Sequence, residues 1–224
     1  MFAFCPAFCY DVFGRYHFER KVIVLKQYRI TRVLSTPDWN SIPVLNVDEH
    51  PWTETFDIRM TQQICYDETG IHIHQRAWEK DIRAEGTELL SRVCEDSCME
   101  FFFQPIPMDG RYFNIEFNLN ACVFLGFGHG RHDSLRIVPE DIKTLFNVRT
   151  ERLSDGWEIF YTIPLSFLRQ FYPSYTLEPG RVIRANSYKC GDKTPNEHYL
   201  LWNPSTSETP DYHRPQDFGE MILA

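Results

Sequence analysis

The sequence lacks the features that would assign it to several large classes of protein. No stretch approaches the roughly 20 apolar residues that a membrane-spanning helix needs. The net charge is −8 and no run of Lys or Arg occurs, which disfavours nucleic acid as a partner, because phosphate contacts need a basic patch. P-loop, G-x-G-x-x-G and G-x-S-x-G motifs are all absent, and no cysteine stands in a catalytic signature. The acidic balance suits a neutral ligand or a bound cation.

The N-terminus also lacks a convincing secretory signal. M-F-A-F-C-P-A-F-C-Y-D has no Lys or Arg before its apolar run, which soon meets Asp11. The seven cysteines are an odd number, whereas a secreted disulfide framework usually has an even count. We therefore expect a soluble, cytoplasmic protein, with export left open. Segment 1–27 differs from the rest and is expected to be a poorly ordered extension.

Residues 28–224 are expected to form one all-β domain. The aromatic content is 15%, and short strand-like runs alternate with turn signals, without internal repeats or low-complexity linkers. One pair of runs, Phe56–Tyr66 and Ile71–Trp78, is joined by D-E-T-G and predicts a hairpin. Only Pro139–Lys143 and Pro164–Phe171 resemble helices. The pattern predicts an antiparallel β-sandwich of about ten strands with one or two short helices.

The segment R-Y-F-N-I-E-F-N-L-N, from Arg111 onward, alternates apolar and polar residues with the period of a strand. Its polar side carries Asn114, Glu116, Asn118 and Asn120. Asn and Glu are depleted in strands, and their oxygens and amide groups together form a dense hydrogen-bonding surface. Such a surface suits a ligand rich in hydroxyl groups. A plain solvated strand face is the alternative.

A second unusual carboxylate is Glu100, in the strand-like run S-C-M-E-F-F-F. On a strand it shares its face with Cys98 and Phe102. A carboxylate in such surroundings needs hydrogen-bond donors or a cation, or its pKa must rise. The alternative to ligand binding is an ion pair with an arginine such as Arg83 or Arg111.

The C-terminal stretch carries aromatic side chains, including Tyr212 and His213, in a polar and Pro-rich loop. Exposed aromatics on loops of a rigid scaffold are common binding surfaces, and a ring can stack on the apolar face of a pyranose. We predict a binding role for Tyr212. Trp202, which Leu200 and Leu201 precede, is predicted to lie in the core.

Three groupings resemble metal ligands, but none brings a full set at a recognised spacing. They are His72 with His74, His129 and His132 with Asp133, and Cys94 with Cys98. Surface or hydrogen-bonded side chains explain each grouping more simply. We therefore assign no metal ligands from the sequence.

Six segments, taken in order, resemble the family 9 carbohydrate-binding modules and their DOMON-like relatives. They cover nearly everything beyond the N-terminal extension. The resemblance implies a β-sandwich that binds a mono- or oligosaccharide between aromatic rings, with polar strand residues on its hydroxyls. The segments are I-P-V-L-N-V-D-E-H-P-W (42–52), E-D-S-C-M-E-F-F (95–102), R-Y-F-N-I-E-F-N (111–118), G-W-E-I-F-Y-T-I-P-L (156–165), R-A-N-S-Y-K-C-G-D (184–192) and D-Y-H-R-P-Q-D-F-G (211–219).

By position in these motifs, the resemblance implies a set of ligand-binding residues. One stacking Trp of the family falls on Tyr212, and a second falls at or near Cys94, where this chain has no ring. Trp78 is a candidate replacement, and Asn114 stands where the family has Arg, so the fold transfers better than the sugar specificity. The predicted ligand-binding residues are Glu100, Asn114, Glu116, Asn118, Asn186, Tyr188, Tyr212 and Trp78.

The leading hypothesis is therefore a non-catalytic carbohydrate-binding protein without a certain cofactor. Some relatives bind structural calcium, which the acidic balance permits, although no ligand set can be assigned. The alternative is a glycan-active hydrolase or lyase that uses Glu100 and Glu116 as an acid/base pair. A haem-binding domain would instead need axial ligands such as Met60, Met99 or His72 around one pocket.

Overall fold

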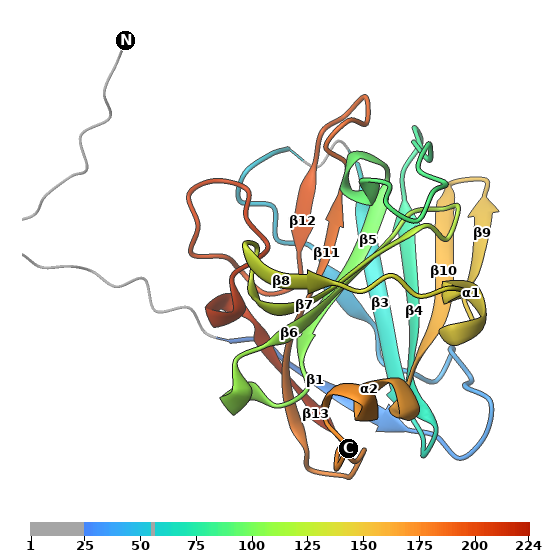
Figure 1. Cartoon of the computed structure of the whole chain (residues 1–224). Coiled ribbons are helices and arrows are strands. Elements are labelled where there is room, and N and C mark those ends of the chain that lie inside the picture. The colour runs from blue at the N-terminus through green and yellow to red at the C-terminus, as the bar shows by residue number, and fades with distance from the viewer. Residues whose placement is uncertain (1–24, 55–56) are drawn as a thin grey trace, which may run out of the picture.

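The described structure, residues 25–54 and 57–224 of the computed structural model, contains thirteen β-strands and two short helices (Figure 1). Residues 1–24 of the expected extension, and Phe56 at the start of one expected strand, lie outside the described residues. The strands are β1 (Gln27–Arg32), β2 (Leu45–Val47), β3 (Arg59–Tyr66), β4 (Gly70–Trp78), β5 (Cys98–Gln104), β6 (Tyr112–Phe117), β7 (Val123–Gly130), β8 (Asp133–Arg136), β9 (Arg149–Leu153), β10 (Gly156–Pro164), β11 (Val182–Cys190), β12 (Tyr199–Leu201) and β13 (Gly219–Leu223). The helices are α1 (Ile142–Leu145) and α2 (Leu165–Phe171), with single 3-10 turns at Val93–Glu95, Pro107–Asp109 and Pro215–Asp217.

All thirteen strands belong to one hydrogen-bonded sheet with the order β8-β7-β6-β5-β11-β13-β1-β3-β4-β10-β9, and β12 and β2 pair with β11 and β3 beside this path. Strand β1 is parallel to both neighbours: its first residues pair with β13 and its last with β3. The all-β class and the short helices are confirmed. The prediction of an antiparallel sandwich of about ten strands is not confirmed, because the thirteen strands form one continuous sheet with parallel and antiparallel pairs. Two strands were not predicted from the sequence. Strand β1 begins at the boundary of the expected extension, and β8 is exposed and shows no alternation of apolar and polar residues.

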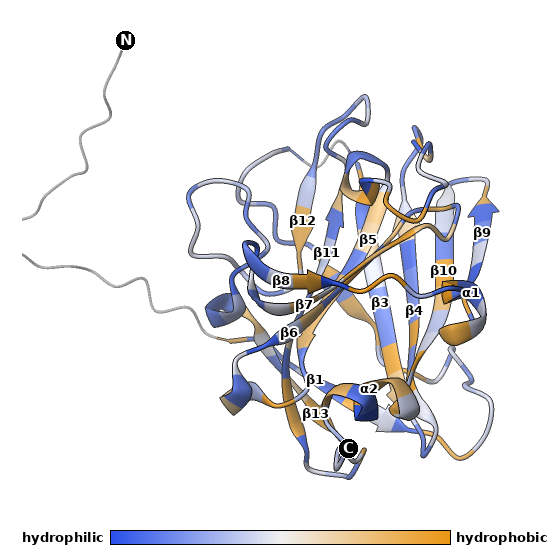
Figure 2. Ribbon diagram, viewed as in Figure 1, coloured by the Kyte–Doolittle hydropathy of each residue, from blue (hydrophilic) through white to orange (hydrophobic). Residues whose placement is uncertain are grey.

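One large apolar core joins distant parts of this sheet. Phe117 of β6 lies 5.1 Å from Tyr161 of β10 between ring centroids, although these strands are far apart in the sheet order. The sheet therefore folds over so that two halves face one core. Figure 2 shows apolar and polar residues alternating along β3 and β4, as expected for strands with one face in this core.

Local sequence signals place the turns and helices around the core. The expected hairpin is β3–β4, and the Asp67 carboxylate accepts from the backbone N–H of Thr69 at 2.7 Å in its turn. Helix α2 begins directly after Pro164, as expected. Helix α1 begins later than expected, after Asp141, because that carboxylate caps the first turn by accepting from the Thr144 N–H at 3.1 Å.

A buried ion pair links β11 to the segment after β4. Lys189 is fully buried, and its Nζ lies 3.2 Å from Oε1 of Glu79, which is equally enclosed. The same carboxylate accepts from Trp157 Nε1 at 2.6 Å and from Ser97 Oγ at 2.8 Å. On its other side the ammonium group donates to His198 Nε2 at 2.8 Å. This network fixes the end of β11, where the strand reaches the candidate site described below.

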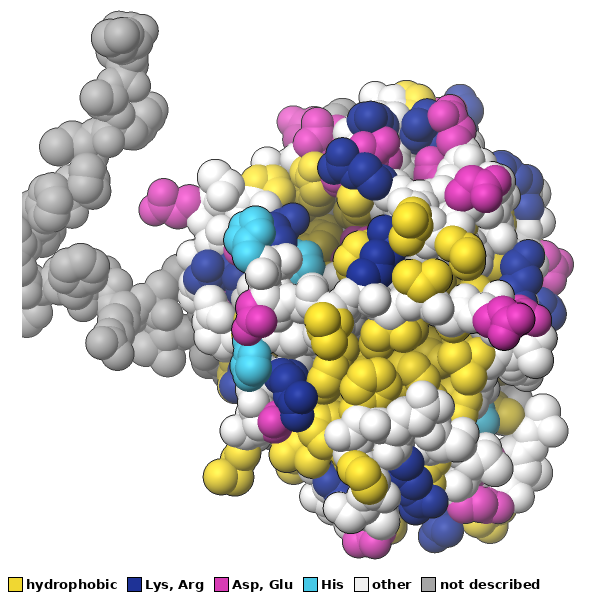
Figure 3. Space-filling model, viewed as in Figure 1, with side chains coloured by type: hydrophobic (Ala, Val, Ile, Leu, Met, Phe, Trp, Pro, Cys, Tyr) yellow, Lys and Arg dark blue, Asp and Glu magenta, His cyan; other side chains and the backbone are white. Residues whose placement is uncertain are grey.

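The surface of the described part of the chain mixes charged and apolar side chains. Figure 3 shows a band of apolar side chains across the middle of one face, with charges of both signs around it. Among the exposed large apolar residues are Leu89, Leu90, Leu135 and Val138. Within residues 25–54 and 57–224, neither helix has the length and apolar character needed to cross a membrane.

Candidate functional site

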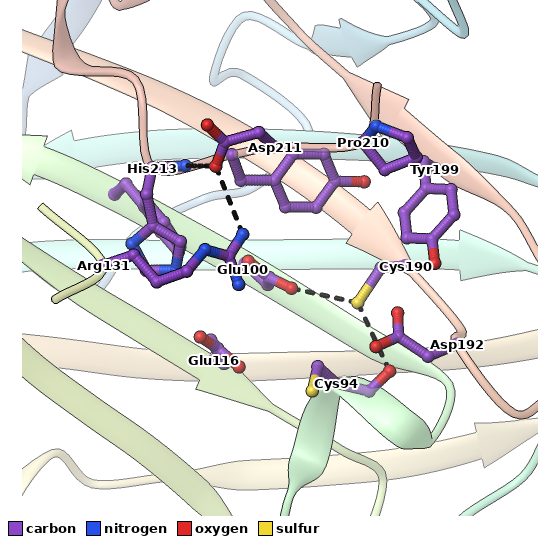
Figure 4. Close-up of a pocket in the computed structure, with 12 residues that line it drawn as sticks. Cys94, Glu100, Glu116, Arg131, Cys190, Asp192, Tyr199, Pro210, Asp211 and His213 are labelled. Carbon is purple, nitrogen blue, oxygen red and sulfur yellow. Dashed lines mark hydrogen bonds and ion pairs between the residues drawn. The ribbon is translucent and has the colours of Figure 1, made fainter. Parts of the chain in front are cut away.

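A cavity of about 170 Å³ lies on the face of β5, β6 and β11 that points away from the shared core. Alternate residues of the three strands form its floor, since neighbouring residues of a strand point to opposite faces. The turn before β5, the β7–β8 turn and the loop that follows β12 form its walls (Figure 4). The lining residues are Cys94, Glu100, Phe102, Glu116, Arg131, Cys190, Asp192, Tyr199, Pro210, Asp211, Tyr212 and His213.

Two carboxyl groups occupy the floor of this cavity. Glu100 of β5 and Glu116 of β6 are directly opposite in the antiparallel register, and they are 2% and 7% exposed. The Cys190 thiol donates to Oε1 of Glu100, with 3.0 Å between the sulfur and the oxygen. In Figure 4 no hydrogen bond joins Glu116 to another of the residues drawn. The other residues that line the cavity therefore leave the Glu116 carboxyl group without a hydrogen-bond partner, and its neighbour on the strand is Asn114.

The arginines considered as partners of Glu100 pair with other acids. Arg83 lies 3.3 Å from Asp96, and Arg111 lies 2.6 Å from Asp109. A thiol, and not a guanidinium, is thus the hydrogen-bond donor to the buried Glu100 carboxyl group.

Burial raises the pKa of the carboxyl groups in this cavity. The pKa of Glu100 lies well above its ordinary value, first because of burial and then because of the nearby Glu116 charge. Burial raises the pKa of Glu116 to about 7, and the neighbouring Asn114 amide opposes this only in part. The pKa of Asp192 is also raised by burial. At neutral pH the floor therefore offers carboxyl groups that donate as well as accept hydrogen bonds.

Charged and polar groups from two loops form the rim. The guanidinium group of Arg131, in the β7–β8 turn, lies 3.2 Å from the Asp211 carboxylate. That carboxylate also accepts from the backbone N–H of His213 at 3.1 Å. Burial lowers the pKa of His213 to about 4, so its imidazole is neutral at pH 7, and its Nδ1 lies 2.7 Å from the Tyr112 hydroxyl. The rim thus combines a guanidinium, a carboxylate and a neutral ring.

Aromatic rings form one wall of the cavity. Tyr212 stacks on Tyr188, with 4.0 Å between ring centroids and 13° between planes, and is 8% exposed. Its hydroxyl donates to the Lys189 carbonyl at 3.0 Å. Tyr199 is less buried than Tyr212 and lies edge-on to it at 6.2 Å. One face of Tyr212 is therefore already covered, and Tyr199 adds a second ring to the same wall.

The loop that carries Tyr212 and His213 is held by buried polar groups at both ends. Asn186 accepts from the backbone N–H of Asn203 at 2.8 Å and donates to its carbonyl at 3.0 Å. Asp217 accepts from the Thr206 backbone N–H at 2.8 Å. These contacts fix where the loop leaves β12 and where it rejoins β13, so the aromatic wall keeps its position.

The structure brings three of the eight residues predicted for ligand binding into the cavity: Glu100, Glu116 and Tyr212. Asn114 is buried beside Glu116, with an Oδ1 that has no hydrogen-bond partner in the described part of the chain, and Tyr188 supports Tyr212. The others lie outside the cavity lining. Asn118 stabilises the turn after β6 through hydrogen bonds to Cys122 and Asp96. Asn186 holds the loop that follows β12. Trp78 lies on β4 beside Arg59 and Arg76.

Several cavity residues were not predicted from the sequence. Arg131 and Asp192 follow strand ends in H-G-R-H-D and C-G-D, and polar residues at strand ends often reach a site. Tyr199 begins the short strand β12. The apolar residues that follow it suggested a buried strand, whereas Tyr199 itself is partly exposed. Trp202 is 5% exposed and packs in the large core, as predicted.

In the described residues, the histidine and methionine ligands considered for this sequence do not gather into one ligand set. His74 stacks on Phe160 at 4.2 Å and bonds to Gln63, so its ring is already satisfied. Met60 and His72 line separate hollows, and Met99 is fully buried in the core. In the described ranges, no three Asp or Glu oxygens lie close enough together to suggest a calcium ligand set.

Comparison with known proteins identifies one matching family and several similar structures. Carbohydrate-binding family 9 matches residues 33–223. A structure from Bacteroides uniformis ATCC 8492, of a protein to which carbohydrate binding has been ascribed, is similar at 24% identity and a TM-score of 0.77, over 90% of this chain and 100% of that one. Family 9 modules from Caldicellulosiruptor kristjanssonii are similar at 13% identity and a TM-score of 0.63. The module in complex with glucose covers 89% of this chain and 96% of its own, and the module with cellotriose covers 88% and 93%. No curated protein sequence gives a significant match.

Proposed function

Because this chain belongs to carbohydrate-binding family 9, we propose that it binds a carbohydrate, without catalysis, in the cavity of Glu100, Glu116 and Tyr212. One observation carries the proposal. A buried carboxyl group, Glu116, lines an open hollow beside aromatic rings and forms no hydrogen bond with another residue of the lining. Buried polar groups are costly unless a partner satisfies them, and sugar hydroxyls would supply that partner.

In this proposal the three parts of the cavity have separate roles. The Glu100 and Glu116 carboxyl groups on the floor bond to hydroxyls in either protonation state. Arg131 and Asp192 on the rim contact the remaining hydroxyls. Tyr199 and Tyr212 contact the apolar face of the ring, as the residues of an aromatic wall do in many binding sites.

The size of the cavity favours a single sugar unit or a chain end. Its volume of about 170 Å³ is below the roughly 300–1,000 Å³ of sites for drug-sized ligands. The glucose and cellotriose complexes of the similar modules support a glucose-type ligand. We also propose that the two halves of the sheet act as the layers of a β-sandwich, with the sugar on the outer face of the layer formed by β5, β6 and β11.

Titration calorimetry with glucose, cello-oligosaccharides and a wider panel of sugars tests the proposal. Glu116→Ala removes a hydrogen bond to a charged or chargeable group, so about 1.5–3 kcal/mol of binding free energy is lost. This corresponds to roughly 10–150-fold weaker binding. Glu151→Ala, which changes an exposed carboxylate on β9, is the matched control and leaves the affinity unchanged. Absence of heat across the whole panel, or equal affinities for the two variants, would refute the assignment.

A further inference from the structure

Three ligand atoms from neighbouring strands converge beneath the cavity. The sulfurs of Cys98 and Cys190 and a carboxylate oxygen of Glu100 all lie within 4.8 Å of one another. Cys98 and Cys190 are direct partners in the register of β5 and β11, and Glu100 is two residues beyond Cys98 on the same face. All three side chains are buried. Two adjacent rigid strands therefore hold the cluster in place.

The spacing of this cluster fits a tetrahedral metal ion. Bonds of about 2.3 Å to sulfur and 2.0 Å to oxygen place tetrahedral ligand atoms roughly 3.3–3.8 Å apart. The Cys190 sulfur is 3.0 Å from Oε1 of Glu100, and the full set lies within 4.8 Å. Side-chain adjustments of about 1 Å bring the three atoms to this tetrahedral spacing.

The donor set and its surroundings indicate which metal it would take. Two sulfurs favour zinc or another thiophilic ion and disfavour calcium and magnesium, which bind oxygen. Glu100 and Cys190 line the cavity, whereas Cys98 is fully buried, so the fourth position would open toward the cavity. Among the described residues, the Glu100 carboxyl group forms no ion pair with Lys or Arg, and its hydrogen-bond donor is the Cys190 thiol. We propose that Cys98, Glu100 and Cys190 bind a zinc ion with one position open to a water molecule or ligand.

The charge balance of this binding step is simple. Zinc replaces the two thiol protons of Cys98 and Cys190 and the proton of the Glu100 carboxyl group, and all three protons leave to solvent. Glu116 and Asp192, two further acidic side chains, also line the cavity.

Cobalt(II) titration of the full chain, reduced and freed of metal, tests the proposal. We expect one equivalent to give the near-ultraviolet absorption of sulfur-to-cobalt charge transfer, and equimolar zinc to abolish it. Cys98→Ser, Cys190→Ser and Glu100→Gln should each weaken binding by about 100-fold or more, because even the loss of an outer partner costs 10–100-fold. Cys65→Ser, at a buried thiol on β3, is the matched control and leaves the titration unchanged.

A second measurement on the unaltered protein covers variants that fail to fold. Zinc should protect Cys98 and Cys190, but not Cys65, from alkylation during partial unfolding, as read by peptide mass spectrometry. The proposal is overturned if the fully reduced protein takes up no cobalt. It is also overturned if Cys65→Ser lowers the affinity as much as Cys190→Ser does, or if zinc does not protect the two thiols. Sugar titrations with and without zinc separate this result from the proposed function, because either activity can be present alone.

Discussion

The buried pair of Lys189 and Glu79 provides a quantitative test of how the site is held. Glu79→Gln keeps the size of the side chain and an oxygen for Trp157 Nε1, but it removes the charge opposite Lys189. At 3.2 Å and an effective dielectric constant near 20, the lost attraction is about 5 kcal/mol. Breaking one side of a buried pair generally costs about 3–5 kcal/mol, since the other charge stays buried without a partner. We expect a loss of unfolding free energy in that range.

Urea unfolding followed by tryptophan fluorescence measures this loss, because Trp157 contacts Glu79 directly. A loss of 3–5 kcal/mol corresponds to a fall in Tm of roughly 6–20 °C for a chain of this size. The double variant Glu79→Gln with Lys189→Met removes both charges and should recover at least half of the lost stability. If Glu79→Gln stays within about 1 kcal/mol of the unaltered protein, or if the double variant is no more stable than the single one, the reasoning is wrong.

Two further predictions concern the surroundings of this network and of the loop. Burial, and then the Lys189 charge, lower the pKa of His198 to about 3, whereas an unfolded histidine titrates near 6.5. Stability should therefore fall as the pH drops from about 6.5 toward 3, and His198→Gln should show a shallower fall in urea unfolding between pH 7 and 5. In Gly219→Ala the new methyl group would lie 2.6 Å from the Trp202 ring, so we expect a loss of about 1–3 kcal/mol. Gly130→Ala, whose new methyl group would meet nothing within 4 Å, should be neutral, and urea unfolding of the two variants measures the difference.

The sequence allowed the residues on the floor of the site to be predicted because they belong to strands. The period of two places Glu100 on one face of its strand, and Glu116 on one face of the next, without any knowledge of the loops. The carboxyl groups then meet because β5 and β6 pair in register. Tyr212 was predicted from its place in a polar, Pro-rich loop, and the resemblance to family 9 pointed to the same residue.

The rest of the site could not be predicted from local patterns. Arg131 reaches the cavity from the β7–β8 turn and meets Asp211, 80 residues away in the chain, so only the fold brings them together. Asn118 and Asn186 have the composition of ligand-binding residues, but they satisfy backbone groups of nearby loops instead. Trp78 was proposed only to replace a missing ring, and no periodicity linked it to the site.

The position of β1 has a consequence for the order of folding. Its first residues pair with β13 and its last with β3, so the earliest strand of the domain is the joint between the two halves of the sheet. This joint cannot close until residues 219–223 have left the ribosome, however early β3 and β4 form their hairpin. Pairing between strands so distant in the sequence is slow to form. A truncation that removes β13 would leave the first half of β1 unpaired and would expose its backbone N–H and C=O groups.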